Sequence, residues 1–223
     1  QFRSLTSKKG KAMLENTNHQ SDDELIDLSK LATEQRIEKI KNIVSKRQPT
    51  LTVVLENVHD AHNVSAVFRS CDAVGVLEVC LIYNSQQFPD LAEKSSASAR
   101  KWVAQRKFTS VDECYTYLRN GGKKIYTTGM NSEATSLYKL DLTQPVALVF
   151  GNEHSGVSQE AIEKADGNFI IPQMGMIQSL NISVACAVSL YEAFRQRDQI
   201  GLYNQIQFDE KTYNSMVREW ILK

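Results

Sequence analysis

Two patterns of hydrophobic and polar positions alternate along this chain. Short continuous apolar runs are typical of strands buried on both faces, and the segments between them carry apolar residues at the spacing of amphipathic helices. The strands that we expect cover residues 51–56, 79–83, 102–108, 124–129, 145–151 and 168–172, and the helices cover 63–74, 110–119, 157–164 and 179–197. This alternation predicts an α/β fold with a mostly parallel sheet that is covered on both faces.

Helical patterns also flank the alternating region. Leucine and isoleucine recur at helical spacing over residues 22–47, where Ser21 and Glu24 resemble a capping box and Pro49 ends the segment. Residues 209–222 predict a terminal amphipathic helix. We therefore expect a leader without fixed structure at residues 1–20, an N-terminal helical extension at 21–48, a main domain at 49–198 and a C-terminal helical extension at 199–223.

Composition narrows the class of protein. The chain is 42% hydrophobic and 23% charged, which is ordinary for a globular protein. No apolar run approaches the roughly 20 residues that a membrane span needs, and the first residues lack the apolar core of a secretory signal. The four cysteines form no Cys-x-x-Cys pair. We therefore expect buried free thiols in a cytoplasmic protein, and no metal site.

The formal net charge of zero gives no indication of nucleic-acid binding by itself. Basic residues nevertheless gather in clusters, which leaves two interpretations open: a locally basic face, or ordinary solvated surface. The clusters are Lys8, Lys9 and Lys11; Lys46 and Arg47; Arg100, Lys101, Arg106 and Lys107; and Arg195 and Arg197.

Three expected strands are followed by unusually polar segments: NVHDAHNVSAVFRS, NEHSGVS and QMGMIQSLNIS. Turn formation and helix capping explain any one of them. Because ligands of parallel sheets bind beyond the carboxyl ends of the strands, three such segments together favour a functional site there. No GxGxxG, GxxxxGK[ST] or GxSxG motif is present. This argues against a dinucleotide-binding Rossmann fold, a P-loop NTPase and an α/β-hydrolase.

These segments resemble the three motifs of the SpoU/TrmH group of SPOUT methyltransferases. The motifs are HNVSAVFRSCDAVGV (62–76), FGNEHSGVS (150–158) and IIPQMGMIQSLNISVACAV (170–188), and they occur in the family's order. The similarity runs from about residue 34 to about residue 197 and is greatest to the members that methylate the ribose of guanosine 18 in tRNA. It implies a SPOUT fold whose C-terminal part forms a deep trefoil knot, an exception to the rule of unknotted chains.

The resemblance also implies S-adenosyl-L-methionine as the cofactor, held in the knot largely by backbone groups of three loops. The matching positions are Thr128, Gly129, Gly151, Asn152, Ile171 and Leu180. The family's polar active-site residues match Asn63, Arg69, Glu153, Ser179 and Asn181. Helix capping is an alternative role for Ser179 and Asn181, and a helix N-terminal position is an alternative for Glu153.

The family assigns activation of the ribose 2′-hydroxyl to the residue that matches Arg69. A protonated guanidinium has no lone pair with which to accept a proton. Either Arg69 is forced neutral, or it anchors an RNA phosphate that accepts the proton, and the second is chemically easier. Asn63 and Arg69 lie six residues apart, so they face one cleft only if the first helical turn is irregular.

The same resemblance implies RNA contacts by His62, Lys101, Arg195 and Arg197. It also implies a homodimer with tRNA as its partner. Helix 180–194 and the apolar face of the terminal helix are candidate dimer surfaces. For Trp102, packing in the core is favoured over stacking on RNA. Two alternatives stay open: a ribosomal RNA 2′-O-methyltransferase of the same family, and a non-catalytic RNA-binding SPOUT protein.

Overall fold

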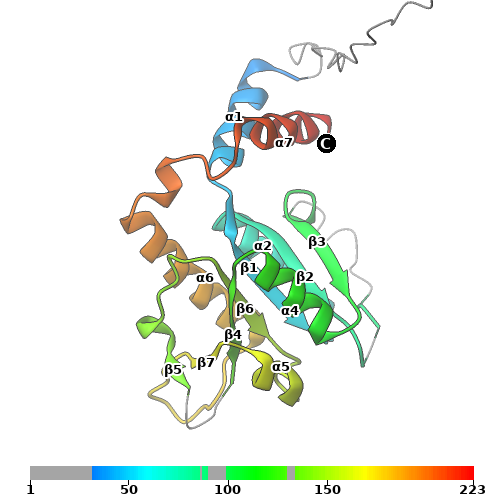
Figure 1. The fold of residues 1–223 in the computed structure, drawn as a ribbon, viewed down its shortest axis with the longest axis vertical. Helices are drawn as coiled ribbons and strands as arrows, with labels where there is room; N and C mark the ends of the chain where they lie inside the picture. The colour runs from blue at the N-terminus through cyan, green and yellow to red at the C-terminus, as the bar shows by residue number, and fades with distance from the viewer. Residues whose placement is uncertain (1–31, 86, 90–98, 130–133) are drawn as a thin grey trace, which may run out of the picture.

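The structure is a computed structural model that describes residues 32–85, 87–89, 99–129 and 134–223. In this part of the chain, seven strands form one sheet in the order β3-β2-β1-β6-β4-β7-β5, and every neighbouring pair is parallel (Figure 1). The predicted α/β class with a parallel sheet is therefore confirmed. The strands are β1 Gln48–Glu56, β2 Val76–Ile82, β3 Ala104–Phe108, β4 Lys124–Thr128, β5 Thr135–Ser136, β6 Val146–Phe150 and β7 Gly167–Ile170.

Helices cover both faces of this sheet. Their bounds are α1 Glu34–Ser45, α2 Ala61–Ala73, α4 Val111–Asn120, α5 Gln159–Lys164, α6 Ile182–Gln199 and α7 Glu210–Leu222, with 3-10 turns η2 Leu137–Lys139 and η3 Leu202–Asn204. In β1, Val53 and Leu55 belong to the core under α2 and α6, whereas Val54 belongs to the core under α4 and α5. Burial on both faces explains why these strands read as continuous apolar runs.

Polar side chains set the starts of the helices that follow the strands. Each accepts a hydrogen bond from a backbone N–H of the first turn, an arrangement that contributes about 1 kcal/mol per helix. The capping residues are Asp60 for α2, Ser110 for α4, Ser158 for α5 and Asn181 for α6. The segments that leave the strands are therefore fixed at both of their ends.

The terminal helices α1 and α7 pack against each other at the end of the molecule where β1 begins (Figure 1). Trp102 joins their apolar cluster, with its ring centroid 4.9 Å from that of Trp220. The core packing favoured for Trp102 is thus confirmed, although the strand begins at Ala104 and not at residue 102. The apolar face of α7, a candidate dimer surface, is instead buried against α1, with Val217 and Trp220 both under 5% exposed.

Two further differences concern the ends of expected elements. The expected N-terminal helical segment is described only from residue 32, where α1 follows; the Ser21–Glu24 capping box and the leader lie outside the described residues. Strand β5 and turn η2 were not predicted, because two strand residues are too few to show a period.

No helix in the described ranges has the length and apolar character that crossing a membrane requires.

Candidate active site

Three segments that are far apart in the sequence meet at the carboxyl ends of the strands, and hydrogen bonds join them. The Asn63 side-chain amide donates to Glu153 Oε1 at 2.9 Å, and the Asn181 amide donates to Asn63 Oδ1 at 3.0 Å. Asn63 lies in the first turn of α2, Glu153 in the loop after β6, and Asn181 at the N-cap of α6. The predicted convergence of these loops is therefore observed.

Glu153 binds the start of α2 with both carboxylate oxygens. Oε2 accepts from the His59 backbone N–H at 3.0 Å, and Oε1 accepts from that of Asp60 at 3.1 Å. Partial burial raises the pKa of Glu153, but the bonds from Asn63, His59 and Asp60 outweigh it and hold that pKa below its ordinary value. Glu153 is therefore a carboxylate at neutral pH, and it stands at the N-terminus of α2, where negative charge is favoured.

The turn after β6 is built around a close approach of backbones. A Cβ on Gly151 would lie 2.1 Å from the carbonyl of Gly156, so only glycine fits. Asn152 N donates to Gly156 O and Gly156 N to Asn152 O, each at 2.9 Å. The Asn152 side chain reaches the Asn57 carbonyl at 2.8 Å, which ties this turn to the end of β1. Glycine and asparagine at these positions are explained by this geometry.

The other predicted cofactor loops lie beside this turn, because β6, β4 and β7 are neighbours in the parallel sheet. Thr128 ends β4, and its hydroxyl donates to Val149 O in β6 at 3.0 Å. Gly129 N donates to Phe169 O in β7 at 3.3 Å. Ile171 follows β7, and Leu180 immediately precedes the N-cap of α6. The predicted positions thus lie together at the carboxyl ends of neighbouring strands.

Two predicted catalytic residues are not part of the hydrogen-bonded cluster. Helix α2 is regular from Ala61 to Ala73; Asn63 is 8% exposed, while Arg69 lies on the exposed side. The condition of an irregular first turn is not met, so the two side chains point in different directions. Among the described residues, Arg69 forms no hydrogen bond or ion pair with another side chain. Ser179 is exposed and lies before the N-cap, so its alternative role as the α6 cap is wrong, whereas Asn181 does cap α6.

The predicted RNA-binding residues divide into exposed and buried groups. His62, Lys101 and Arg195 are exposed; Arg195 pairs with Glu192 at 2.7 Å. Arg197 is fully buried. Its guanidinium donates to Leu142 O, Gln48 Oε1, Thr50 Oγ1, Thr50 O and Gln144 O at 2.8–3.2 Å. The prediction of an RNA contact for Arg197 is therefore corrected: this side chain ties α6 to the start of β1.

Sequence reasoning missed two features of this edge. Glu56, at the end of β1, is 1% exposed and accepts from the backbone N–H and the hydroxyl of Ser158 at 2.8 and 2.5 Å. A carboxylate that ends an apolar run, as in LTVVLE, was the available signal. Gln173, in the loop after β7, has a buried Oε1 with no hydrogen-bond partner among the described residues. Nothing in the sequence marks this oxygen.

The fold and the site define a parallel α/β protein whose polar loops meet at the carboxyl ends of the central strands. The SpoU rRNA methylase family matches residues 50–191, more than half of the chain, and the chain belongs to this family. A tRNA (guanosine(18)-2'-O)-methyltransferase of Thermus thermophilus is 44% identical over 191 residues, covering 86% of this chain and 98% of that protein.

The chain is also similar to a solved structure and to a relative that is named for ribosomal RNA. The crystal structure of the Aquifex aeolicus TrmH/SpoU tRNA modifying enzyme matches with a TM-score of 0.78 and 36% identity, covering 84% of this chain and 95% of that one. A 23S rRNA (guanosine-2'-O-)-methyltransferase of Haemophilus influenzae is 34% identical over 160 residues, covering 71% of this chain and 65% of that protein.

Proposed function

We propose that this protein transfers a methyl group from S-adenosyl-L-methionine to a ribose 2′-hydroxyl of tRNA, at guanosine 18. The observation that carries the proposal is the hydrogen-bonded series Glu153–Asn63–Asn181, which joins three segments at the carboxyl ends of the strands. The Thermus relative named for this reaction matches almost over its full length, whereas the 23S rRNA relative shares a lower identity over a shorter segment. These values favour tRNA over the ribosomal alternative.

The residues present fit the cofactor. Backbone groups at Thr128, Gly129, Gly151, Asn152, Ile171 and Leu180 would hold it. The buried Oε1 of Gln173 supports this assignment, because an orphaned acceptor in the same loop is unfavourable until a donor reaches it. When bound, S-adenosyl-L-methionine supplies a methyl group made electrophilic by the adjacent sulfonium. The close backbone packing at Gly151 leaves no room for a side chain in this loop.

For proton transfer, we assign Arg69 to the RNA phosphate. An exposed guanidinium presents a planar set of N–H donors and is suited to bidentate phosphate binding. The attacking hydroxyl must lose its proton, and a phosphate oxygen held by Arg69 is an acceptor that a protonated guanidinium cannot itself provide. Asn63 and Asn181 are positioning residues, since their amides are used in bonds to each other and to Glu153. Ser179 lies two residues before Asn181 and is exposed, so its hydroxyl is accessible to an incoming ribose.

His62, Lys101 and Arg195 remain in the proposal as RNA-contacting residues, because their side chains are exposed. His62 is the best placed of these, since it belongs to the first turn of α2 beside Asn63. Arginine and lysine provide the salt-dependent part of such binding. Arg197 is left out because it has no exposed surface.

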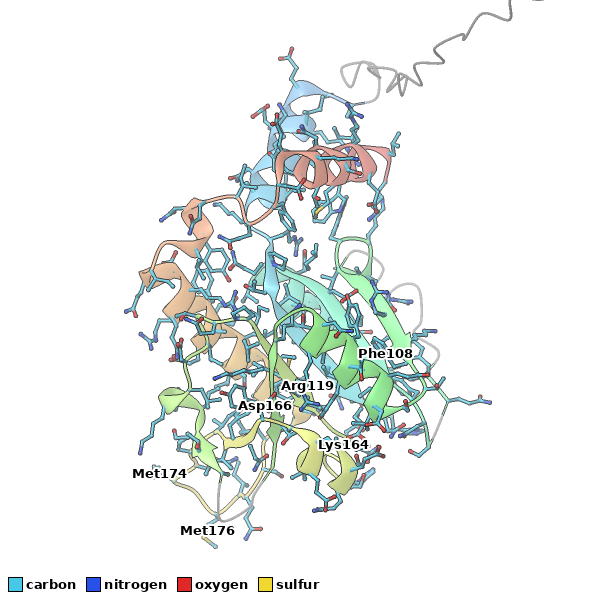
Figure 2. All side chains as sticks on the ribbon, viewed as in Figure 1. Phe108, Arg119, Lys164, Asp166, Met174 and Met176 are labelled. Atoms are coloured by element: carbon cyan, nitrogen blue, oxygen red, sulfur yellow. The ribbon has the colours of Figure 1, made fainter. Side chains whose placement is uncertain are left out.

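A homodimer and a C-terminal trefoil knot complete the proposal, in the cytoplasm where tRNA is found. The dimer is supported by exposed apolar side chains that continue from the loop before α6 onto α6 itself. Met174 and Met176 are 95% and 99% exposed and project from the end of the molecule (Figure 2), and Val184 and Tyr191 on α6 are 47% and 54% exposed. Such side chains are unfavourable in water and typical of an interface between subunits.

The test is methyl transfer to an unmodified tRNA transcript and to a 23S rRNA transcript, followed by mass-spectrometric mapping of the methylated nucleoside. We expect 2′-O-methylguanosine at position 18 of tRNA. Arg69→Ala should lower the rate by about 10²–10⁴-fold while cofactor affinity, measured by calorimetry, stays within about twofold. Arg119→Ala, an exposed arginine on α4, is the control. Methylation of rRNA alone, or loss of cofactor binding in Arg69→Ala, would contradict the proposal.

A further inference from the structure

A cavity lies at the opposite end of the sheet from the loops described above. It has a volume of about 610 Å³ and is bordered by α1, the end of α2, α6 and α7. Arg47 and Gly75, which border it, directly precede β1 and β2. Strand β1 therefore separates the cavity from the Glu153–Asn63–Asn181 cluster, and its nine residues span roughly 30 Å at about 3.3 Å each. The two places cannot hold the same nucleotide.

The charged side chains of the cavity are mostly basic. Arg36, Lys39 and Lys46 share one face of α1 and its C-cap at spacings of three and seven residues, and Arg47 adds a fourth cation. The acidic side chain is Asp72, which is already paired with Arg47. Three cationic groups thus remain without an acid partner in the lining, which favours an anionic occupant.

Two pairs of aromatic rings also line the cavity, together with the aliphatic side chains of Ile40, Ile43 and Val74. The Trp102 and Trp220 rings lie 4.9 Å apart, and the Phe194 and Tyr203 rings also lie 4.9 Å apart. Aromatic faces next to cations are the combination that binds single-stranded nucleic acid, because bases stack on the rings while lysine and arginine hold the phosphates. A simple inorganic anion would leave the aromatic walls unused.

Arg47 gives an independent indication that the cavity takes a hydrogen-bond acceptor. Its side chain is 1% exposed and lines the cavity, and its Nε has no hydrogen-bond partner among the described residues. The other guanidinium nitrogens are used: Nη1 donates to the Val76 carbonyl at 3.1 Å, and Nη2 donates to Asp72. A buried donor without an acceptor is unfavourable, and a phosphate or base oxygen in the cavity would supply one.

From these observations we infer that the cavity between α1 and α7 binds an unpaired nucleotide of the RNA, distant from the nucleotide that is methylated. The base lies against the partly exposed sides of Trp102, Phe194 and Tyr203, since Trp220 is 4% exposed and its ring is already covered by Arg47 at 4.9 Å. The phosphate of that nucleotide is held by Lys39 and Lys46. The inference rests on the proposed function for the identity of the RNA. It adds a second anchoring point, so that the terminal helices fix the RNA at one end of the sheet while the 2′-hydroxyl is presented at the other.

Tryptophan fluorescence reports on this cavity directly, because the chain contains two tryptophans and both line it. Titration of the full chain with a tRNA transcript should quench this fluorescence saturably, at the same concentration that saturates binding. Guanosine 5′-monophosphate and inorganic phosphate are titrated in parallel. No quenching by saturating tRNA overturns the inference, and so does saturable quenching by the mononucleotide with none by tRNA, which would assign the cavity to a free metabolite.

The double variant Lys39→Ala/Lys46→Ala tests the phosphate contacts, and Lys41→Ala/Lys211→Ala is the matched control. Lys41 lies on α1, as Lys39 does, and Lys211 lies on α7; neither lines the cavity. The first pair should reduce the slope of log Kd against log salt by about 0.7–0.9, the value for the one phosphate that both lysines hold, and weaken tRNA binding about tenfold, and the control pair should do neither. Equal effects of the two pairs overturn the inference. Methyl transfer by the wild-type protein tests the proposed function separately, so failure of one can be distinguished from failure of the other.

Discussion

The amide of Asn63 donates to the carboxylate of Glu153 across 2.9 Å, which connects the first turn of α2 to the loop after β6. The two residues are 90 positions apart in the sequence. Asn63 also accepts a bond from Asn181, so one side chain uses its donor and its acceptor to hold two different loops. Because Asn63 is 8% exposed, water cannot readily replace either partner.

Asn63→Ala should therefore destabilise the protein and impair catalysis together. Removal of the side-chain amide takes one of its two donors from Glu153 Oε1, which keeps the bond from Asp60, and takes the acceptor from the Asn181 amide, at a cost of about 1–3 kcal/mol for the two lost bonds. We expect that loss in the free energy of unfolding in urea, together with a methyl-transfer rate at least tenfold lower. Asn214→Ala, an exposed asparagine on α7, is the control and should change both by little. Full activity in Asn63→Ala would show that the loops do not depend on this bond.

Glu153 should make the stability of the protein depend on pH in the acid range. Its folded-state pKa is lowered, so its contribution to stability is present above its unfolded pKa and is lost as the pH falls through the folded value. Between about pH 4.5 and that lower value, wild-type melting temperature should fall more steeply than that of Glu153→Gln. Calorimetric melting from pH 7 to pH 3 checks this. Parallel curves would mean that protonation of Glu153 is not linked to folding.

Much of this edge of the sheet was predictable from the sequence. The carboxyl ends of parallel strands all lie at the same end of the sheet. Polar segments that follow three such strands therefore had to approach one another. The partners within that edge were harder to predict. Nothing in the local sequence says that Glu153 binds the backbone before α2 while Asn181 binds Asn63, because these bonds depend on the order of the strands in the sheet.

Arg197 shows why the remaining positions could not be predicted. In the segment YEAFRQR it looks like one of two similar surface arginines. Helical spacing places Arg195 and Arg197 on different faces, but only the packing of α6 against the start of β1 decides that Arg197 is the buried one. The cavity between α1 and α7 has the same origin, since Trp102 and Trp220 meet only in the folded chain.

Arg197→Met and Arg195→Met should therefore have very different consequences. Burial lowers the pKa of Arg197 to about 10, so the guanidinium is still charged at neutral pH, and its removal takes one donor from each of five acceptors. We expect a loss of about 3 kcal/mol or more for Arg197→Met and of at most about 1 kcal/mol for Arg195→Met. Urea unfolding measures both. A weakened affinity for tRNA in Arg195→Met alone would support its proposed contact with RNA.

Gly151→Ala should disrupt the cofactor loop, and Gly175→Ala should not. An added Cβ at Gly151 meets the Gly156 carbonyl at 2.1 Å and the Val157 nitrogen at 2.2 Å, whereas at Gly175 it meets no atom within 4 Å. Backbone atoms cannot move aside as the end of a flexible side chain can, so the turn must open. We expect a loss of about 2–4 kcal/mol in unfolding free energy for the first variant and a change within about 0.5 kcal/mol for the second.

The same pair of variants separates the geometry of the loop from its chemistry. Both substitutions add one methyl group to a loop proposed to border the cofactor, but only Gly151→Ala changes the backbone that would donate and accept hydrogen bonds. Calorimetric titration with S-adenosyl-L-methionine should show at least tenfold weaker binding in Gly151→Ala and near-normal binding in Gly175→Ala. If Gly151→Ala folds stably and binds the cofactor normally, the turn between Gly151 and Gly156 is not part of the cofactor site, and the ligand must be sought along β4 and β7 alone.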